Sequence, residues 1–179
     1  MGGTGQSVLT IGALMLISVL VMNFYRTSND ISTSLDFSRF HLEGLSVLTS
    51  HIEQLSQYFF DEVSTDITSE KALGDFALPA HFGWDADDST VVDDIDDLHG
   101  TTVVDTGISG VIYHVDYNVE YVRLSSGAIV HSDLRQWHKR VTISVSDAFN
   151  PPMIYSMNGN ARMRDTLRIS TVVSYWFYN

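Results

Sequence analysis

The first 25 residues carry no charged side chain, and Arg26 is the first ionised group of the chain. Residues 6–25 form a run of predominantly apolar character, and as an α-helix this run would extend about 30 Å, the thickness of the hydrocarbon core of a bilayer. Its polar members Thr10 and Ser18 suit such a helix because their hydroxyls can donate to the backbone of their own helix. The sequence therefore predicts a membrane-inserting helix over residues 6–25.

Two alternatives to a membrane helix remain open for this apolar run. A buried core helix would need a larger protein wrapped around it. A cleaved secretory signal would need a basic segment before the apolar run and a small-residue cleavage site after it, and the sequence shows neither.

The segment from residue 31 to residue 63 has apolar side chains every three or four positions, which is the period of one helix face. No proline precedes Pro79, so nothing forces a break near the membrane surface. We expect a continuous helix from residue 6 to about residue 63, first apolar all round and then amphipathic. The alternative is two helices hinged at residues 27–30. The stripe consists of Ile31, Leu35, Leu42, Leu45, Leu48, Ile52, Leu55, Phe59 and Val63.

After Gly83 the hydrophobic period changes from that of a helix to that of a strand. Residues 111–122 alternate valine and tyrosine with polar side chains, and residues 141–146 and 167–175 alternate in the same way. Turn signals at 125–127 and at Asn158-Gly159 separate these runs. The sequence predicts an α+β fold in which a long N-terminal helix packs on a small antiparallel sheet of three to five strands.

Composition excludes several classes of function. The net charge is −12 and only ten lysines and arginines are present, which disfavours nucleic acid as a partner. The absence of cysteine excludes disulfides and thiolate metal sites.

With these features the chain resembles the type IV pilin and pseudopilin family. Gly5-Gln6 is similar to the junction between leader and mature chain, and residues 91–100 resemble the acidic "DDVDDYHG" stretch of some minor-pilin-like proteins. The "VTISVSD" and "DTLRIS" segments at 141–147 and 165–170 are also similar to strands of those proteins.

The resemblance implies a division of the chain into three parts. Residues 1–5 would be a leader that is removed between Gly5 and Gln6, after which the new N-terminus is methylated. Residues 6–30 would be the hydrophobic helix of the membrane and of the filament core. Residues 31–179 would be the extracytoplasmic domain, with helix to about residue 63, an acidic loop at 83–100 and the sheet at 101–179.

The same resemblance implies a function and a location. The chain would be a structural subunit, held in the bacterial inner membrane and then packed into a cell-surface filament with copies of itself or with other pilin-like subunits. The residues expected to make these contacts are Val8, Leu9, Thr10, Ile11, Leu14, Leu16, Ile17, Leu20, Val21 and Phe24.

Two positions depart from the family pattern. The leader at residues 1–5 lacks basic side chains, and Thr10 stands where pilins carry a glutamate that helps a new subunit pair with the N-terminus of its neighbour. A threonine cannot neutralise an ammonium group in the bilayer, where an unpaired charge is costly. This favours a minor or tip subunit over a major one. The alternative function is a single-pass membrane-anchored subunit of an envelope complex that binds a partner through its β domain and does not polymerise.

The most conspicuous polar feature is a run of aspartates between the predicted helix and sheet. Calcium takes six to eight oxygen ligands, and a loop rich in aspartate can supply several, although the spacing does not match an EF-hand. A solvated acidic loop, or carboxylates that cap backbone N–H groups, explains the same residues without a metal. The candidate calcium ligands are Asp85, Asp87, Asp88, Asp93, Asp94, Asp96 and Asp97.

Signals for catalysis are weak throughout the chain. None of the seven histidines forms a close ligand pair, and we expect them at the surface or in loops. There is no nucleophile elbow and no phosphate-binding glycine loop, so we expect a protein that is not an enzyme and has no cofactor other than, as a candidate, calcium.

Overall fold

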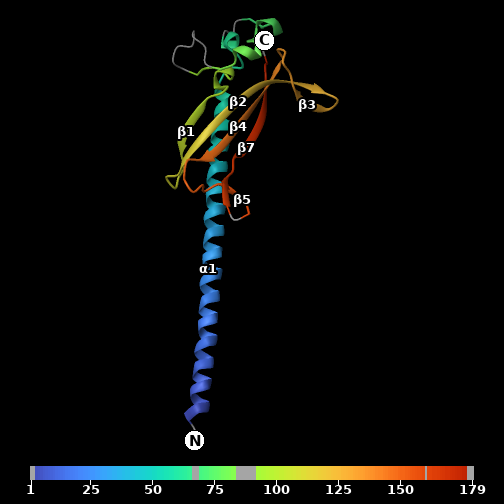
Figure 1. The fold of residues 1–179 in the computed structure, drawn as a ribbon. Helices are drawn as coiled ribbons and strands as arrows, with labels where there is room; N and C mark the ends of the chain where they lie inside the picture. The colour runs from blue at the N-terminus through green and yellow to red at the C-terminus, as the bar shows by residue number, and fades with distance from the viewer. Residues whose placement is uncertain (1–2, 66–68, 84–91, 160, 177–179) are drawn as a thin grey trace. The chain divides into compact units, whose positions relative to one another are not determined.

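The computed structural model describes residues 3–65, 69–83, 92–159 and 161–176. The chain divides into two compact units, residues 1–40 and 41–179. The first unit is helical throughout its described part, and the second combines the end of the same helix with the sheet and its connections (Figure 1). The α+β class predicted from the two hydrophobic periods is confirmed.

Helix α1 runs from Gly3 to Gln54 without interruption at residues 27–30, so the hinged alternative is not what the chain adopts. It continues in the short 3-10 helix η1 (Leu55–Gln57) and then stops, which makes the predicted end at about residue 63 wrong. The reason lies in the backbone of Phe59. Its N–H donates to the Asp93 carbonyl and its carbonyl accepts from the Ile95 N–H, both at 3.0 Å, so this residue pairs with the acidic segment as an extended chain.

Seven strands follow among the described residues. The main sheet is antiparallel, with the order β1-β2-β4-β7, and β3 pairs with the far end of β2, while β5 and β6 form a separate hairpin (Figure 1). The strands are β1 (Thr102–Thr106), β2 (Ile112–Ser125), β3 (Ala128–His131), β4 (His138–Asp147), β5 (Tyr155–Asn158), β6 (Ala161–Arg164) and β7 (Leu167–Ser174).

The tight turn between β2 and β3 follows from residue chemistry. Ser126 and Gly127 have φ values of 51° and 81°, and two consecutive positive φ angles define the turn whose twist matches a two-residue hairpin. The turn signal at 125–127 is therefore confirmed.

The central strands follow the predicted alternation. In β2 and in the residue before it, the six alternating apolar side chains are all buried, and Val141, Ile143 and Val145 of β4 lie buried beside them. Register pairs Val119 with Val141, Tyr117 with Ile143 and Val115 with Val145. One face of the sheet thus forms a continuous apolar layer. The six side chains are Val111, Tyr113, Val115, Tyr117, Val119 and Tyr121.

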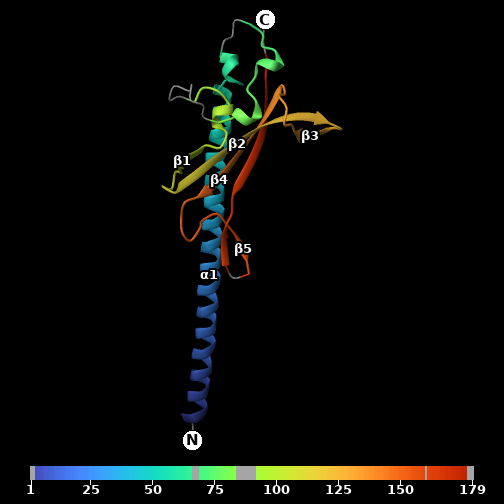
Figure 2. The same cartoon turned by 45° about the horizontal axis from the view of Figure 1, so that its top comes forward.

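Within the second unit, the last turns of α1 cover this layer (Figure 2). The buried helix positions are Gly44, Val47, Leu48, His51 and Leu55. The predicted stripe is thus correct at Leu48 and Leu55. It is wrong at Leu42 and Leu45, which are 68% and 47% exposed.

The buried face of the helix differs from the predicted apolar stripe for a steric reason. A Cβ added to Gly44 would lie 2.9 Å from Leu167 Cδ1 and 3.0 Å from Ile154 Cδ1, so the missing side chain allows the helix to approach the sheet along this line. A stripe counted from apolar residues alone passes over a glycine and a buried histidine.

Where it is described, the chain between helix and sheet contains four more 3-10 helices, and it closes one end of the core. Phe60, Phe76 and Tyr121 are buried together, with Tyr175 and Val63 packed against them. Ring centroids of Phe60 and Phe76 lie 5.2 Å apart in an edge-to-face arrangement. The 3-10 helices are η2 (Glu62–Thr65), η3 (Leu73–Asp75), η4 (Pro79–His81) and η5 (Asp96–Leu98).

The close approach at Gly44 predicts the effect of filling it. Gly44→Val should lower the free energy of unfolding by about 1–3 kcal/mol, because the added methyl groups force Leu167 and Ile154 out of place. Ser46→Val, an equally β-branched change on the exposed side of the same turn, is the matched control and should have little effect. Denaturant unfolding of the full chain in detergent measures both, and equal midpoints would show that the helix does not press against the sheet at Gly44.

Candidate functional site

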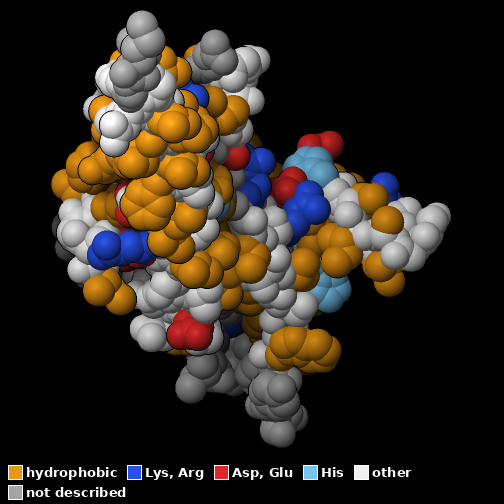
Figure 3. All heavy atoms as spheres, turned by 90° about the horizontal axis from the view of Figure 1, so that it is seen from below, with side chains coloured by type: hydrophobic (Ala, Val, Ile, Leu, Met, Phe, Trp, Pro, Cys, Tyr) orange, Lys and Arg blue, Asp and Glu red, His pale blue; other side chains and the backbone are white. Residues whose placement is uncertain are grey.

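The first unit exposes many large apolar side chains between Val8 and Phe24. The nine large apolar residues expected to make assembly contacts are between 47% and 76% exposed. Figure 3 shows hydrophobic side chains, in orange, over much of the face that it displays. Water is a poor solvent for such a surface, and a stable state requires lipid or protein around it.

Two hydroxyls in the apolar part of the helix bond to its own backbone. Thr10 Oγ1 donates to the Gln6 carbonyl at 2.9 Å, and Ser18 Oγ donates to the Leu14 carbonyl at 2.8 Å, as expected for hydroxyls in an apolar setting. Gly5 and Gln6, the candidate processing pair, are exposed residues of α1. Among the described residues, this is one helix that is long and apolar enough to cross a membrane.

The acidic segment is a built structure where it is described. Asp94, Asp96 and Asp97 are buried, so a solvated loop is the wrong description of these three. The Asp97 N–H donates to Asp94 Oδ1 at 3.1 Å, and the Asp93 N–H donates to Asp97 Oδ2 at 3.4 Å. These carboxylates hold the backbone between helix and sheet, which is the capping role that the aspartate run allows.

The remaining candidate calcium ligands, Asp85, Asp87 and Asp88, lie outside the described residues. Within the described part of the chain, no three His, Asp or Glu side chains form a group that could hold a metal ion. Calcium binding stays a prediction that rests on the composition of the segment.

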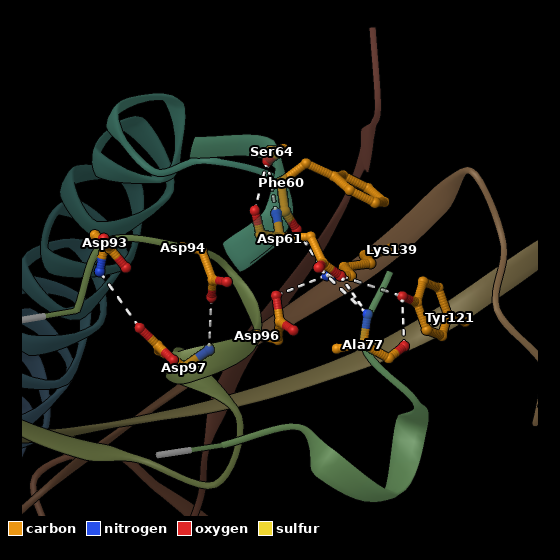
Figure 4. A network of polar contacts seen from close by, with 10 residues as sticks. All are labelled: Phe60, Asp61, Ser64, Ala77, Asp93, Asp94, Asp96, Asp97, Tyr121 and Lys139. Atoms are coloured by element: carbon orange, nitrogen blue, oxygen red, sulfur yellow. Dashed lines mark hydrogen bonds and ion pairs between the residues drawn. The ribbon is translucent and has the colours of Figure 1, made fainter. Parts of the chain in front are cut away.

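The largest concentration of buried charge surrounds Lys139 of β4 (Figure 4). Its side chain is fully buried, and Nζ donates to the Phe60 carbonyl at 2.7 Å, to Asp61 Oδ2 at 2.9 Å and to Asp96 Oδ1 at 2.7 Å. Nζ also lies 4.5 Å from the centre of the Phe60 ring and 5.1 Å from that of Phe82. We call Lys139, Asp61, Asp96 and Asp94 the lysine cluster.

Asp61 is held from the other side by neutral donors. The Ala77 N–H lies 3.0 Å from Asp61 Oδ2 and 3.3 Å from Oδ1, and the Tyr121 hydroxyl lies 3.4 Å from Oδ2. Tyr121 Oη also lies 3.0 Å from the Ala77 carbonyl. Every oxygen of this buried carboxylate therefore faces at least one donor.

Burial sets the protonation of the neighbouring acids. It raises the pKa of Asp94 to about 8, and the negative charge of Asp96 adds to this shift. Burial also raises the pKa of Asp96, although the positive charge of Lys139 opposes the shift. At neutral pH Asp94 therefore carries a proton and is hydrogen-bonded to Asp96.

A second polar contact joins helix and sheet through His51. Its Nδ1 lies 2.5 Å from the Tyr117 hydroxyl and its Nε2 lies 3.2 Å from Asp105 Oδ2. Burial raises the pKa of Tyr117 to about 12, so its hydroxyl keeps its proton and can donate to Nδ1. The expectation of surface histidines is wrong for His51, because both ring nitrogens find partners in the core.

A shallow groove lies at the opposite end of the sheet from the β5–β6 hairpin, where β3 extends beyond the main strands. Its volume is about 230 Å³, and its walls combine apolar side chains with one histidine and one arginine. It is lined by Val122, Arg123, Leu124, Ile129, His138, Val172 and Ser174. These seven lining residues bring no acid–base pair together.

The lysine cluster has a signal in the sequence that hydrophobic periodicity alone does not register. Lys139 has the same parity as Val141, Ile143 and Val145, so the alternation of β4 places it on the inward face. A lysine on that face requires buried partners. The aspartates can be recognised in the sequence from their density. Their partner, Lys139, can be recognised only from its position in the alternation of β4.

Comparisons with known proteins do not add a relative. No protein-family model, no curated protein and no solved structure matches this chain.

The raised pKa of Asp94 predicts a pH dependence of stability. The folded protein keeps this proton up to about pH 8, whereas the unfolded chain releases it near its ordinary pKa of 3.8. The folded state therefore holds more protons in this interval, and the free energy of unfolding falls as pH rises through it. Asp94→Asn, which keeps the acceptor for the Asp97 N–H and a donor toward Asp96, should remove this part of the decline.

The measurement is the denaturation midpoint of the full chain at about pH 5 and about pH 8. We expect Asp94→Asn to gain stability over the unmodified chain, and the gain to be larger at the higher pH. Asp116→Asn, a change at an exposed carboxylate of β2, is the control and should shift both values alike. Parallel pH profiles for Asp94→Asn and the unmodified chain would contradict a protonated Asp94.

Proposed function

We propose that this chain is a structural subunit of a type IV pilus-like filament that assembles through its hydrophobic N-terminal helix. The observation that carries the proposal is the exposure of every large apolar side chain expected to make assembly contacts. A globular domain would bury such residues, at about 25 cal/mol per Å² of apolar surface. A helix that leaves all of them exposed calls for a surrounding phase or a surrounding protein.

The apolar surface of α1 would be covered first by lipid and later by the helices of neighbouring subunits. In the bilayer, the uncharged run matches the hydrocarbon thickness, and the hydroxyls of Thr10 and Ser18 donate to the backbone of their own helix. In a filament, the same side chains would pack against the corresponding segments of other subunits. No catalytic step is needed for this role.

Thr10 bears on which kind of subunit this is. Its hydroxyl is engaged with the Gln6 carbonyl, and it offers no negative charge to the N-terminal ammonium of a neighbour. We therefore place the chain among minor subunits, which assemble with other pilin-like chains rather than forming the bulk of a filament. The same residue favours the second candidate, a single-pass anchored subunit of an envelope complex that does not polymerise. The groove beside β3 would then face its partner.

The test is the location and intact mass of the native protein. A filament subunit should appear in the sheared surface fraction and should have lost residues 1–5 and gained one methyl group. A chain that stays in the membrane fraction with residues 1–5 attached would favour the anchored subunit instead.

A matched pair of variants tests the processing site. A peptidase that cleaves after a glycine leaves no space for a side chain there, so Gly5→Leu should block removal of residues 1–5 and keep the chain in the membrane. Gly3→Leu adds the same side chain within the removed segment and should be processed normally. Mass spectrometry of the membrane and surface fractions measures the processing of both variants. Equal processing of the two variants would rule out cleavage between Gly5 and Gln6.

A further inference from the structure

Lys139 is unusual because lysine is rare in this chain and because this lysine is buried. The chain has two lysines, Lys71 and Lys139, and the second is fully buried with two carboxylates at hydrogen-bond distance. The groups that meet at Nζ come from three separate segments: Phe60 and Asp61 follow the helix, Asp96 belongs to η5, and Lys139 itself belongs to β4.

Burying these groups as ion pairs costs free energy. Each buried charge loses its hydration, and a buried pair often contributes no more stability than apolar residues of the same volume. In this cluster one ammonium faces two carboxylates, so an excess of negative charge is buried as well, in part relieved by the proton on Asp94. A neutral product would remove the cost of burying the reacting pair.

We propose that Lys139 and Asp61 condense to an intramolecular isopeptide bond, with Asp96 as the proton relay. The bond joins Lys139 Nζ to Asp61 Cγ. It ties the segment that follows α1 covalently to the central strand β4.

Asp61 is the better electrophile because of its donors. The Ala77 N–H donates to Oδ2 at 3.0 Å. The Tyr121 hydroxyl lies 3.0 Å from the Ala77 carbonyl and 3.4 Å from Oδ2, and it can turn its one hydrogen toward Oδ2 when charge develops there. Donors fixed in this way stabilise the negative charge that develops on a carboxyl oxygen when an amine adds to its carbon. The raised pKa of Tyr121, which burial and the charge of Asp61 produce, keeps its hydroxyl protonated for that role.

Asp96 is placed to move the protons. Its Oδ1 lies 2.7 Å from Nζ, and Asp94 is hydrogen-bonded to it on the other side. Asp96 takes a proton from the ammonium, and the freed lone pair of Nζ attacks Asp61 Cγ. A second proton leaves nitrogen as the C–N bond forms. Both protons end on the departing Asp61 oxygen, which leaves as water.

The balance needs no other reactant. An ammonium and a carboxylate give one amide and one water, the amide nitrogen keeps one hydrogen, and no atom is oxidised or reduced. The carboxyls of Asp96 and Asp94 end in the protonation states in which they began.

The surroundings favour the product over hydrolysis. Phe60, Phe82 and Tyr121 place their rings within 5.4 Å of Nζ, measured to the ring centres, and exclude bulk water from the pair. Groups held in reacting geometry behave as though each were present at about 10⁵–10⁸ M, which offsets the unfavourable equilibrium of amide formation in water. The inference is independent of the filament proposal, since it concerns only the second unit.

The decisive experiment uses the purified full chain without substitution. Its intact mass under denaturing conditions should be one water mass below that of the residues present. Acylation of amines in denaturant should modify Lys71 and the N-terminus but not Lys139. An intact mass without this loss, together with a reactive Lys139, would overturn the proposal and leave the cluster as ion pairs.

Tryptic peptides identify the linked residues. Cleavage after Arg39, Lys71, Arg123, Arg135 and Arg140 should release residues 40–71, which contain Asp61, joined to residues 136–140, which contain an uncleaved Lys139. A link between residues 72–123 and 136–140 would instead identify Asp96 as the electrophile and overturn the assignment of Asp61.

Variants assign the roles. Asp61→Ala should abolish the mass loss, whereas Asp96→Asn should slow it by about 10²–10⁴-fold, the usual contribution of a positioned proton acceptor. Lys71→Arg, which leaves the cluster intact, is the control and should keep the full loss. Retention of the mass loss in Asp61→Ala, or an unchanged rate in Asp96→Asn, would contradict the roles assigned to these two aspartates. The mass of the unmodified chain decides the main question even if a variant fails to fold.

Discussion

The second unit is organised around one buried ammonium group. Lys139 Nζ has three hydrogens and three acceptors, of which Phe60 and Asp61 lie outside any helix or strand and Asp96 begins the short 3-10 helix η5. Because an unpaired charge at this depth would be prohibitive, the segments that carry Phe60, Asp61 and Asp96 have to converge on β4. The bridge between Phe59 and Asp94, the burial of Phe76 and the position of η5 all accompany that convergence.

The first unit obeys a different constraint. Its helix contains no charged side chain before Arg26, pairs the hydroxyls of Thr10 and Ser18 with its own backbone and leaves its apolar side chains without cover. The two units therefore differ in which groups they bury and which they expose. The second excludes water from a lysine through its own fold, and the first leaves a large apolar surface exposed.

Periodicity was sufficient for the parts of the fold that repeat. The alternation in β2 and β4 predicted which side chains face the core, and the uninterrupted apolar run predicted the helix. It was insufficient where burial depends on a single contact between distant residues. Gly44 is inward because Leu167 and Ile154 need the space, and His51 is inward because Tyr117 and Asp105 pair with it. Neither residue is apolar enough to count in a hydrophobic stripe. The same limit applies to the acidic segment, whose dense aspartates are compatible with a cation, with caps or with a solvated loop. Only the fold shows that Asp96 meets a lysine 43 residues later and that Asp94 shields it with a proton.

The place of β4 in the sheet has a mechanical consequence. β4 pairs with β2 on one side and with β7 on the other, so Lys139 lies on an interior strand. Tension pulling on α1 would reach the sheet through the packed last turns of the helix and also through the residues between its end and Asp61. Because Asp61 and Phe60 are hydrogen-bonded to an interior strand, the load on that connection would act on two ladders of hydrogen bonds, where an edge strand would offer one.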